Sequence, residues 1–358
     1  GFPGLRTGLL GSSRRWRNWR QSAVRADLVC SLEVGVAGNL LVTSIGAKVP
    51  LLRAARNALT RVDPAARLVG ADLDGQCIGR WFVDVFWKTP PLEALAPYEM
   101  VEFCRRHEVR WLIPTRDAEL PVFSRWVEED GIDLPRVLVP SSRTAELCGD
   151  KLRFARALAD RAPVIPTWDV LPERPPERFP ADRWVVKERR GAGSRRIYLD
   201  VARETAREVA SGFSSPVFQP YVSGVEYSVD LYLSDKGEPW GCVVRRREVV
   251  VDGESQVTVI VSHPDAEKCA MEVAAAVGLR GCGVVQLLED EEGRLFVVEC
   301  NPRFGGATTL SVAAGLDVFF WFLRESEDPD FRPGEFVRGR PGLRQVRHKC
   351  DFIVEPSQ

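Results

Sequence analysis

The chain has 358 residues, which is long enough for two or three domains with a substantial core. Its apolar content of 45%, charged content of 28% and net charge of -1 are ordinary for a globular protein and predict neither a nucleic-acid surface nor a membrane span. Nine scattered cysteines and three distant histidines argue against a zinc site or a disulfide framework and favour a reducing, cytoplasmic environment.

Residues 1–38 differ in composition from the rest of the chain. They are rich in arginine and carry Trp16 and Trp19 within the basic cluster. We expect a disordered basic leader here. A contact with RNA or a membrane surface, or a targeting peptide, remains an alternative.

Residues 39–148 alternate between apolar strands and helical spacing. Strands are expected at 39–46, 66–71, 109–114 and 136–140, with helices at 50–59, 92–107 and before the last strand. This order predicts a parallel, Rossmann-like sheet. Residues 43–46 lack the glycine fingerprint of dinucleotide-binding proteins. The acidic residues after the strands are candidate substrate contacts, with helix caps or solvated turn residues as the alternative: Asp72, Asp74, Asp117 and Glu119.

A single helix is expected over 141–160, with Asp150 and Lys151 in its middle. The proline-rich residues 163–180 then predict a linker to a second domain. After it, a strand from Trp184 ends in Lys187, and the following loop contains the residues Gly191, Gly193 and Ser194. Such a loop suits phosphate oxygens, because its backbone N–H groups can approach an anion. A plain hairpin turn is the alternative.

Residues 217–230 follow a predicted helix at 201–211 and form two strands joined by a turn at Ser223 and Gly224. Glu226 begins the second strand, where its carboxylate can accept hydrogen bonds from ribose hydroxyls or form a salt bridge. A strand over 240–251 carries Arg245 and Arg247 on one face and Arg246 on the other. Two guanidinium groups suit an acyl phosphate or a carboxylate, and an exposed strand edge is the alternative.

The hairpin of residues 283–301 carries the most specific pattern. Strict alternation places Val297, Glu299 and Asn301 on one face, with Phe296 and Val298 on the other, and Gln286 can join the first set from the neighbouring strand. Three oxygen donors of this kind suit Mg²⁺, and Arg303 beyond them is placed to meet an anion. A hairpin whose polar residues simply face water is the alternative. Helices are expected at 265–277 and 310–324, and a strand near 351–354.

In this order, the set from Asp150 to Arg303 resembles the ATP-grasp superfamily, most closely the carboxylate–amine ligases related to one half of the carbamoyl-phosphate synthetase large subunit. The likeness covers residues 39–325. It implies an α/β and α+β fold in which ATP lies between a small lid domain and a larger metal-binding domain. The implied ranges are a leader (1–38), a Rossmann-like domain (39–148), a connecting helix and linker (149–182), a lid (183–223), a metal-binding part (224–330) and a tail (331–358).

The resemblance also implies roles for individual residues. Catalytic roles fall to Arg303, Arg245 and Lys187, and metal binding to Gln286, Glu299 and Asn301. The residues implied to bind ATP are Lys151, Lys187, Gly191, Gly193, Ser194, Gln219, Tyr221, Val222 and Glu226. The chain departs from the family pattern at Glu188, Gln219 and Gln286, where proline, an acidic residue and Asp or Glu are common.

The implied activity is an ATP-dependent, ADP-forming ligase that activates a carboxylate as an acyl phosphate and joins it to an amine. Alternatives are phosphoryl transfer without an amine acceptor and ATP binding without turnover. The implied cofactors are ATP and Mg²⁺, with Mn²⁺ as a substitute. The expected partners are a small carboxylate and an amine, in a protein that can form a homodimer.

Overall fold

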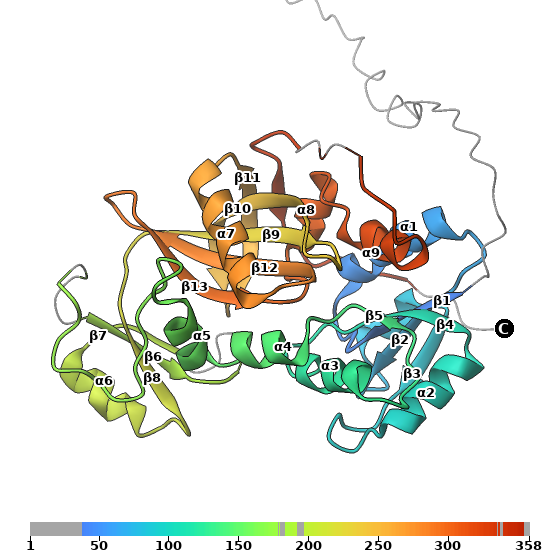
Figure 1. Ribbon diagram of the computed structural model, residues 1–358, viewed down its shortest axis with the longest axis horizontal. Helices are drawn as coiled ribbons and strands as arrows, with labels where there is room; N and C mark the ends of the chain where they lie inside the picture. The colour runs from blue at the N-terminus through green and yellow to red at the C-terminus, as the bar shows by residue number, and fades with distance from the viewer. Residues whose placement is uncertain are drawn as a thin grey trace, which may run out of the picture. The chain divides into compact units, whose positions relative to one another are not determined.

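The computed structural model describes residues 38–177, 179, 183–191, 197–334, 336 and 339–353. Apart from Gly38, the predicted leader lies outside these residues, and so do Gly193 and Ser194. Three sheets organise the described part, one parallel and two antiparallel, which confirms the predicted fold class (Figure 1). The boundaries drawn between the subdomains stay predictions. Within the described ranges, no helix is long and apolar enough to cross a membrane.

The first sheet has five parallel strands in the order β3-β2-β1-β4-β5. Its central strands are almost wholly buried, as the uninterrupted apolar runs predict. The short edge strand β3 and the 3₁₀ helix η1 before it were missed, because four half-exposed residues give no periodic signal. The elements are β1 (Asn39–Thr43), α1 (Val49–Val62), β2 (Leu68–Asp72), η1 (Ile78–Phe82), β3 (Val85–Lys88), α2 (Pro97–Arg106), β4 (Val109–Ile113), α3 (Leu120–Glu128) and β5 (Arg136–Val137).

The single helix predicted over 141–160 is wrong. The structure has two helices there, α4 (Ser142–Cys148) and α5 (Lys151–Leu158). The break occurs because Asp150 is extended and caps the second helix, where its carboxylate accepts from the Arg153 N–H at 3.1 Å. Lys151 therefore begins a helix instead of lying inside one.

The second sheet is small and has the order β7-β6-β8. Trp184 and Val186 of its middle strand pack against Ala206 of the accompanying helix, which closes a separate small core. The elements are β6 (Arg183–Glu188), β7 (Ile197–Ala202), α6 (Arg203–Ala210) and β8 (Pro216–Pro220).

The third sheet has six antiparallel strands in the order β13-β12-β9-β10-β11-β14. Helix α7 packs on one face, where Val273 and Ala274 meet Val229 and Val285. The elements are β9 (Val225–Leu233), β10 (Pro239–Val251), β11 (Glu254–Val261), α7 (Pro264–Val277), β12 (Gly281–Glu289), β13 (Leu295–Asn301), α8 (Thr308–Ala313), α9 (Val318–Glu327) and β14 (Arg344–Val346).

Two predictions in the C-terminal third are wrong. The helix expected over 310–324 is two helices, because Gly315 between them has a φ of 101° that ends α8. The added strand lies at Arg344–Val346, not near 351, because the free edge of β11 pairs with it there and residues 351–353 have no strand partner.

Candidate ATP-binding and metal site

One cleft brings the predicted site residues together. It has a volume of about 2990 Å³. It is lined from the parallel sheet, from the small sheet and from the face of the large sheet opposite α7. Every described residue for which the resemblance implies a catalytic, ATP-binding or metal-binding role lines it: Lys151, Lys187, Gly191, Gln219, Tyr221, Val222, Glu226, Arg245, Gln286, Glu299, Asn301 and Arg303. Their individual roles stay predictions. Of the acidic residues predicted as substrate contacts, Asp117 lines the cleft, and Asp72, Asp74 and Glu119 are not among its lining residues.

The predicted metal ligands lie on the cleft face of β12 and β13. Gln286 and Glu299 are directly opposite one another, and Asn301 lies opposite Val284, two residues along the same face. Asn301 Nδ2 donates to Glu299 Oε1 at 2.9 Å. Gln286 makes no side-chain hydrogen bond within the described ranges, which leaves its amide available to a ligand.

The strict alternation predicted for β13 is wrong at one point. The register shifts after the Gln286–Glu299 pair, so that Leu287 faces Val297 and Val298 is the extra residue. Val297 therefore lies in the core beneath the sheet with Leu287, while Phe296 joins the cleft side with Val222. The bulge keeps Glu299 and Asn301 on the cleft face.

These three side chains fit a hard divalent cation. They offer one carboxylate and two amides, all with oxygen atoms, from two hydrogen-bonded strands. The described part of the chain contains no group of three or more His, Cys, Asp or Glu that could hold a metal, so such an ion would depend on the amides as well as on Glu299. Glu299 is also close enough to Glu226 to raise the pKa of that carboxyl.

Lys187 lies at the end of β6 and lines the same cleft as Glu299. Its side chain is buried, with 7% exposure, and it forms no hydrogen bond or ion pair with another described residue. Burial lowers its pKa from 10.5 to about 8, Glu299 opposes this shift, and Lys151 adds to it. A buried cation without a partner is costly, and it marks a place for an anion.

Lys151 and Gly191 lie together beside Lys187. Lys151 Nζ donates to the Gly191 carbonyl at 2.9 Å. The buried Asp150 holds this region, because it accepts from Arg189 Nε at 2.8 Å and from Arg190 Nη2 at 3.1 Å. Sequence inspection missed the role of Asp150, although Asp before a helix is a common capping signal.

The residues predicted to contact adenine form the segment at the end of β8. Gln219 Nε2 donates to Thr167 Oγ1 at 2.8 Å, so its amide oxygen remains available. The Tyr221 N–H donates to the Arg183 carbonyl at 2.8 Å. Val222 packs with Ile165 and Phe296. The segment therefore presents both an apolar side chain, Val222, and a polar amide, Gln219, to the cleft.

Glu226 is ion-paired with Arg247. Arg247 also donates from Nε to Ser255 Oγ at 2.9 Å and from Nη2 to the Gly253 carbonyl at 2.7 Å. Burial raises the pKa of Glu226, and Arg247 opposes that shift. The structure thus has the salt bridge that was the alternative for Glu226, at the cleft wall where the ribose contact was expected.

Arg245 has a partner that the sequence did not indicate. Its Nε donates to Asp230, and both side chains are almost fully buried. Asp230 also accepts from Thr308 Oγ1 and from Ser311 Oγ. The guanidinium is therefore fixed at the floor of the cleft by a satisfied carboxylate.

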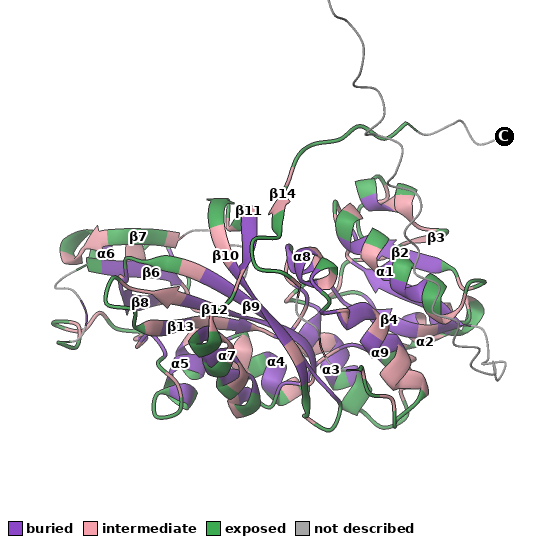
Figure 2. Ribbon diagram, turned by 90° about the horizontal axis from the view of Figure 1, so that it is seen from above, coloured by how far each residue is buried: buried purple, intermediate pink, exposed green. Residues whose placement is uncertain are grey.

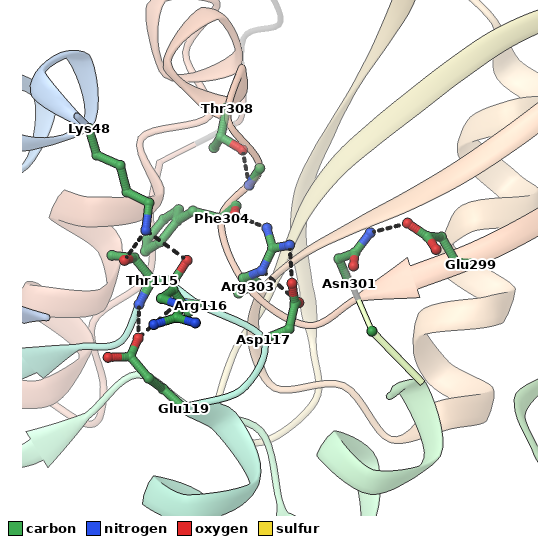
Figure 3. Close-up of polar contacts among 12 residues, drawn as sticks. Lys48, Thr115, Arg116, Asp117, Glu119, Glu299, Asn301, Arg303, Phe304 and Thr308 are labelled. Atoms are coloured by element: carbon green, nitrogen blue, oxygen red, sulfur yellow. Dashed lines mark hydrogen bonds and ion pairs between the residues drawn. The ribbon is translucent and has the colours of Figure 1, made fainter. Parts of the chain in front are cut away.

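The end of the cleft at the parallel sheet contains a second polar group, shown in Figure 3. Arg303 pairs with Asp117, while Lys48 Nζ donates to the Ser44 carbonyl at 2.7 Å and to Thr115 Oγ1 at 2.6 Å. Burial lowers the Lys48 pKa from 10.5 to about 8. Lys48 was missed, although a lysine between a strand end and a helix is placed to reach this edge.

The acidic candidates at this edge are largely engaged within the protein. Glu119 accepts from Ser44 Oγ at 2.7 Å and from the backbone N–H groups of Thr115 and Arg116. Asp72 accepts from the Gly46 N–H at 2.7 Å, and Asp74 from the Gln76 N–H at 2.8 Å. These are contacts of turn and loop residues and not helix caps, since neither η1 nor α3 has a side-chain cap hydrogen bond.

Comparisons with known proteins agree with this arrangement. Residues 213–346 match a family model described as ATP-grasp in the biosynthetic pathway with Ter operon. No curated protein matches the chain by sequence. Similar solved structures do exist, and their low identity to this chain makes them evidence of fold.

Three solved structures resemble the chain over most of its length. The biotin carboxylase-β-γ-ATP complex from Campylobacter jejuni has a TM-score of 0.65 at 14% identity, covering 84% of this chain and 73% of its own. The L-amino acid ligase from Bacillus licheniformis has a TM-score of 0.64 at 16% identity, covering 85% and 77%. The biotin carboxylase domain of the Hydrogenobacter thermophilus 2-oxoglutarate carboxylase, in complex with MgADP, ADP and bicarbonate, has a TM-score of 0.65 at 17% identity, covering 84% and 72%.

The sheets, the cleft and these similarities lead to one conclusion: the chain has the ATP-grasp fold, and its residues 213–346 match an ATP-grasp family.

Proposed function

We propose that the protein is an ATP-dependent ligase that activates a substrate carboxylate as an acyl phosphate, releases ADP and joins the acyl group to an amine. The observation that carries the proposal is the buried Lys187, which has no hydrogen-bond or ion-pair partner among the described residues and lies on the same cleft as the oxygen donors of Gln286, Glu299 and Asn301. A cation without a partner beside a set of oxygen donors suits a nucleotide phosphate with its metal ion.

The reaction has two displacement steps. A carboxylate oxygen of the substrate attacks the γ-phosphorus of ATP, the bond to the bridging oxygen breaks, and ADP leaves. The amine nitrogen then attacks the acyl carbon, phosphate leaves, and the nitrogen loses a proton. Neither step needs a protein nucleophile, so the contribution expected of the chain is positioning and charge stabilisation.

Positioning and charge stabilisation are assigned to individual side chains of the cleft. Lys151 and Lys187 bind phosphates, with Gly191 beside them. Gln219, Tyr221 and Val222 contact the adenine, and Glu226, with Arg247, meets the ribose. Arg245 and Arg303 stabilise the anionic groups of the reacting carboxylate and the transferring phosphoryl.

Gln286, Glu299 and Asn301 would hold Mg²⁺, with Mn²⁺ as a substitute. When bound there, the ion would neutralise negative charge on the nucleotide phosphates. Two of the similar proteins support the proposal by what their names state: one is an L-amino acid ligase, and another was solved with MgADP. The biosynthetic pathway in the family description also fits an amide-forming role. The cysteines of the described part form no disulfide, which fits a reducing, cytosolic location.

The test is ADP and phosphate release on an array of carboxylates crossed with amines, with product masses measured by mass spectrometry. Amide formation that requires both substrates supports the ligase. ADP formation without any need for an amine would replace it with simple phosphoryl transfer, and ATP binding without ADP formation would replace it with a binding protein.

A matched pair of variants makes the test specific to the site. Glu299→Gln should lower ADP release by about 10³-fold or more, because it removes a metal ligand and its charge. Glu291→Gln changes an exposed carboxyl in the turn of the same hairpin and should leave ADP release unchanged. Wild-type turnover in Glu299→Gln would contradict the proposed site.

A further inference from the structure

The chain after β14 is fixed to the large sheet at its start. Residues 344–346 pair antiparallel with Val257–Val259 of β11, and the Arg347 N–H donates to the Gln256 carbonyl at 2.9 Å. The Arg347 guanidinium then pairs with Glu254 Oε2 at 2.7 Å and donates to the Gly306 carbonyl. Arg347 thus joins the sheet edge to the loop that follows Arg303.

Beyond this anchor, residues 348–353 form what we call the C-terminal strap. They are exposed along their whole length (Figure 2), yet they line the cleft that holds the predicted site. The ring centroids of Phe352 and Phe82 are 4.7 Å apart, and Phe82 belongs to η1 beside the parallel sheet. The strap therefore crosses the cleft from the large sheet to the parallel sheet.

The strap and η1 carry an unusual set of exposed apolar side chains. Ile78 is 58% exposed, Trp81 51%, Phe352 55% and Ile353 83%, and all four line the cleft. Single exposed apolar residues are common, but a group of large ones in one cleft marks a binding surface. The contact between the rings of Phe352 and Phe82 joins the apolar side chains of the strap to those of η1.

Another region of the same cleft is cationic. Lys48, Arg116 and Arg303 line it, and the acidic side chains beside them are already bonded, since Asp117 pairs with Arg303 and Glu119 with Ser44. The cleft therefore has a cationic region and an apolar region, and the charged Arg53, Lys349 and Asp351 line it beside the apolar one. A molecule with an anionic head and an apolar body would complement both.

We propose that the strap and η1 form the specificity pocket for the carboxylate substrate, and that this substrate carries a bulky apolar or aromatic group. The inference rests on the proposed function, and it adds the substrate class. The reacting carboxylate lies toward Arg303, and the apolar group lies between Trp81 and Phe352. Burial of those exposed rings against the substrate supplies the selectivity.

The test uses the full chain with ATP, Mg²⁺ and a fixed mixture of amines. The carboxylates are matched pairs that differ only by the apolar group: glycine with phenylalanine, alanine with tryptophan, and acetate with phenylacetate. The kcat/KM for ADP release should favour the aromatic member of each pair by about ten-fold or more. Trp81→Ala and Phe352→Ala should each reduce that preference several-fold without changing the KM for ATP.

Tyr98→Ala is the matched control, because Tyr98 is an aromatic residue that is 73% exposed on α2 and does not line the cleft. It should behave as the wild type. A wild-type preference for the small members, or an equal loss for both members in Trp81→Ala, would overturn the pocket and leave the ligase proposal standing.

A binding measurement separates the two proposals further. Calorimetric titration of phenylacetate and acetate into the protein with ADP and Mg²⁺ needs no turnover. Tighter binding of phenylacetate, lost in Trp81→Ala, would support the pocket even if no carboxylate gave ADP release, a result that would contradict only the proposed function. Equal or absent binding of the two acids would overturn the pocket.

Discussion

Arg303 and Asp117 form a bidentate ion pair between segments that follow strands of two different sheets. Arg303 Nε donates to Asp117 Oδ1 at 2.7 Å and Nη2 to Oδ2 at 2.5 Å, across 186 residues of sequence. A third donor, Nη1, meets the Phe304 carbonyl at 2.7 Å. Burial lowers the pKa of Arg303, Asp117 raises it, and the net direction is upward. Among the residues that the structure describes, one N–H on each terminal nitrogen has no acceptor and can meet a substrate anion.

Asp117→Asn should release Arg303 from this geometry. The partly buried guanidinium would lose a charged partner, so we expect the free energy of unfolding to fall by about 1–3 kcal/mol. Because the orientation of Arg303 is also lost, the KM for the carboxylate should rise more than the KM for ATP. Chemical denaturation and steady-state kinetics measure the two effects. Asp74→Asn is the control, since Asp74 is exposed and caps only a local turn. A KM for the carboxylate equal to that of the wild type would contradict the positioning role.

The sequence predicted the parallel sheet and the hairpin because these depend on local patterns, whereas the set of residues that line the cleft was implied by the resemblance to the ATP-grasp superfamily. Buried strands leave apolar runs, and side chains on one strand face share a period of two. The faces of Arg245, Arg246 and Arg247 were predicted in this way, and the register of β10 with β9 and β11 confirms them. Gln286 was expected to be able to join the face of Glu299 from the neighbouring strand, and the register between β12 and β13 places it directly opposite Glu299.

The remaining features depend on pairings between distant residues. The bulge at Val298 comes from the register between β12 and β13, which one strand alone does not indicate. The partners of Arg245 and Arg303 lie on other strands or in another sheet. The split of residues 141–160 depends on Arg189 and Arg190, which draw Asp150 out of a continuous helix.

Gln286→Glu should tighten metal binding. The variant places a second carboxylate directly opposite Glu299, which adds negative charge where the wild type has a neutral amide. Without Mg²⁺, the two like charges should lower the melting temperature, and added Mg²⁺ should restore it. The Mg²⁺ concentration for half-maximal ADP release should fall below that of the wild type, while Gln286→Ala should raise it. An unchanged Mg²⁺ requirement in both variants would remove Gln286 from the metal site.

Asp150→Ala should loosen the loop that begins at Arg189. Asp150 is fully buried, caps α5 and pairs with two arginines, so its loss removes a cap and leaves cations unpaired. We expect a loss of about 2–4 kcal/mol in the free energy of unfolding. Faster backbone hydrogen exchange should follow in residues 188–191. Arg190→Ala, which removes the more exposed partner, is the milder control. Equal stability of Asp150→Ala and wild type would contradict the anchoring role.

Lys187→Met should raise the free energy of unfolding and weaken nucleotide binding. The Lys187 pKa falls from 10.5 to about 8 in the folded chain. The unfolded chain therefore binds the extra proton between these values, and the stability contributed by Lys187 rises with pH across that window. Below pH 8, burial of the charged form costs about 3 kcal/mol, so the variant should be more stable than the wild type at pH 7. That gain should shrink as the pH rises from 8 to 10.5.

Nucleotide binding should change in the opposite direction. Loss of the cation should weaken the affinity for a non-hydrolysable ATP analogue by about ten-fold or more, because charge-assisted contacts to phosphate are among the strong ones. The wild-type affinity should fall as Lys187 loses its proton at alkaline pH, and the variant should lack that component. Lys48→Met is the control, because burial lowers the Lys48 pKa to about 8 as well, but its amino group bonds to Ser44 and Thr115. Calorimetry at pH 7 and pH 9 distinguishes the two lysines. Equal analogue affinity in Lys187→Met and wild type would contradict a phosphate contact at Lys187.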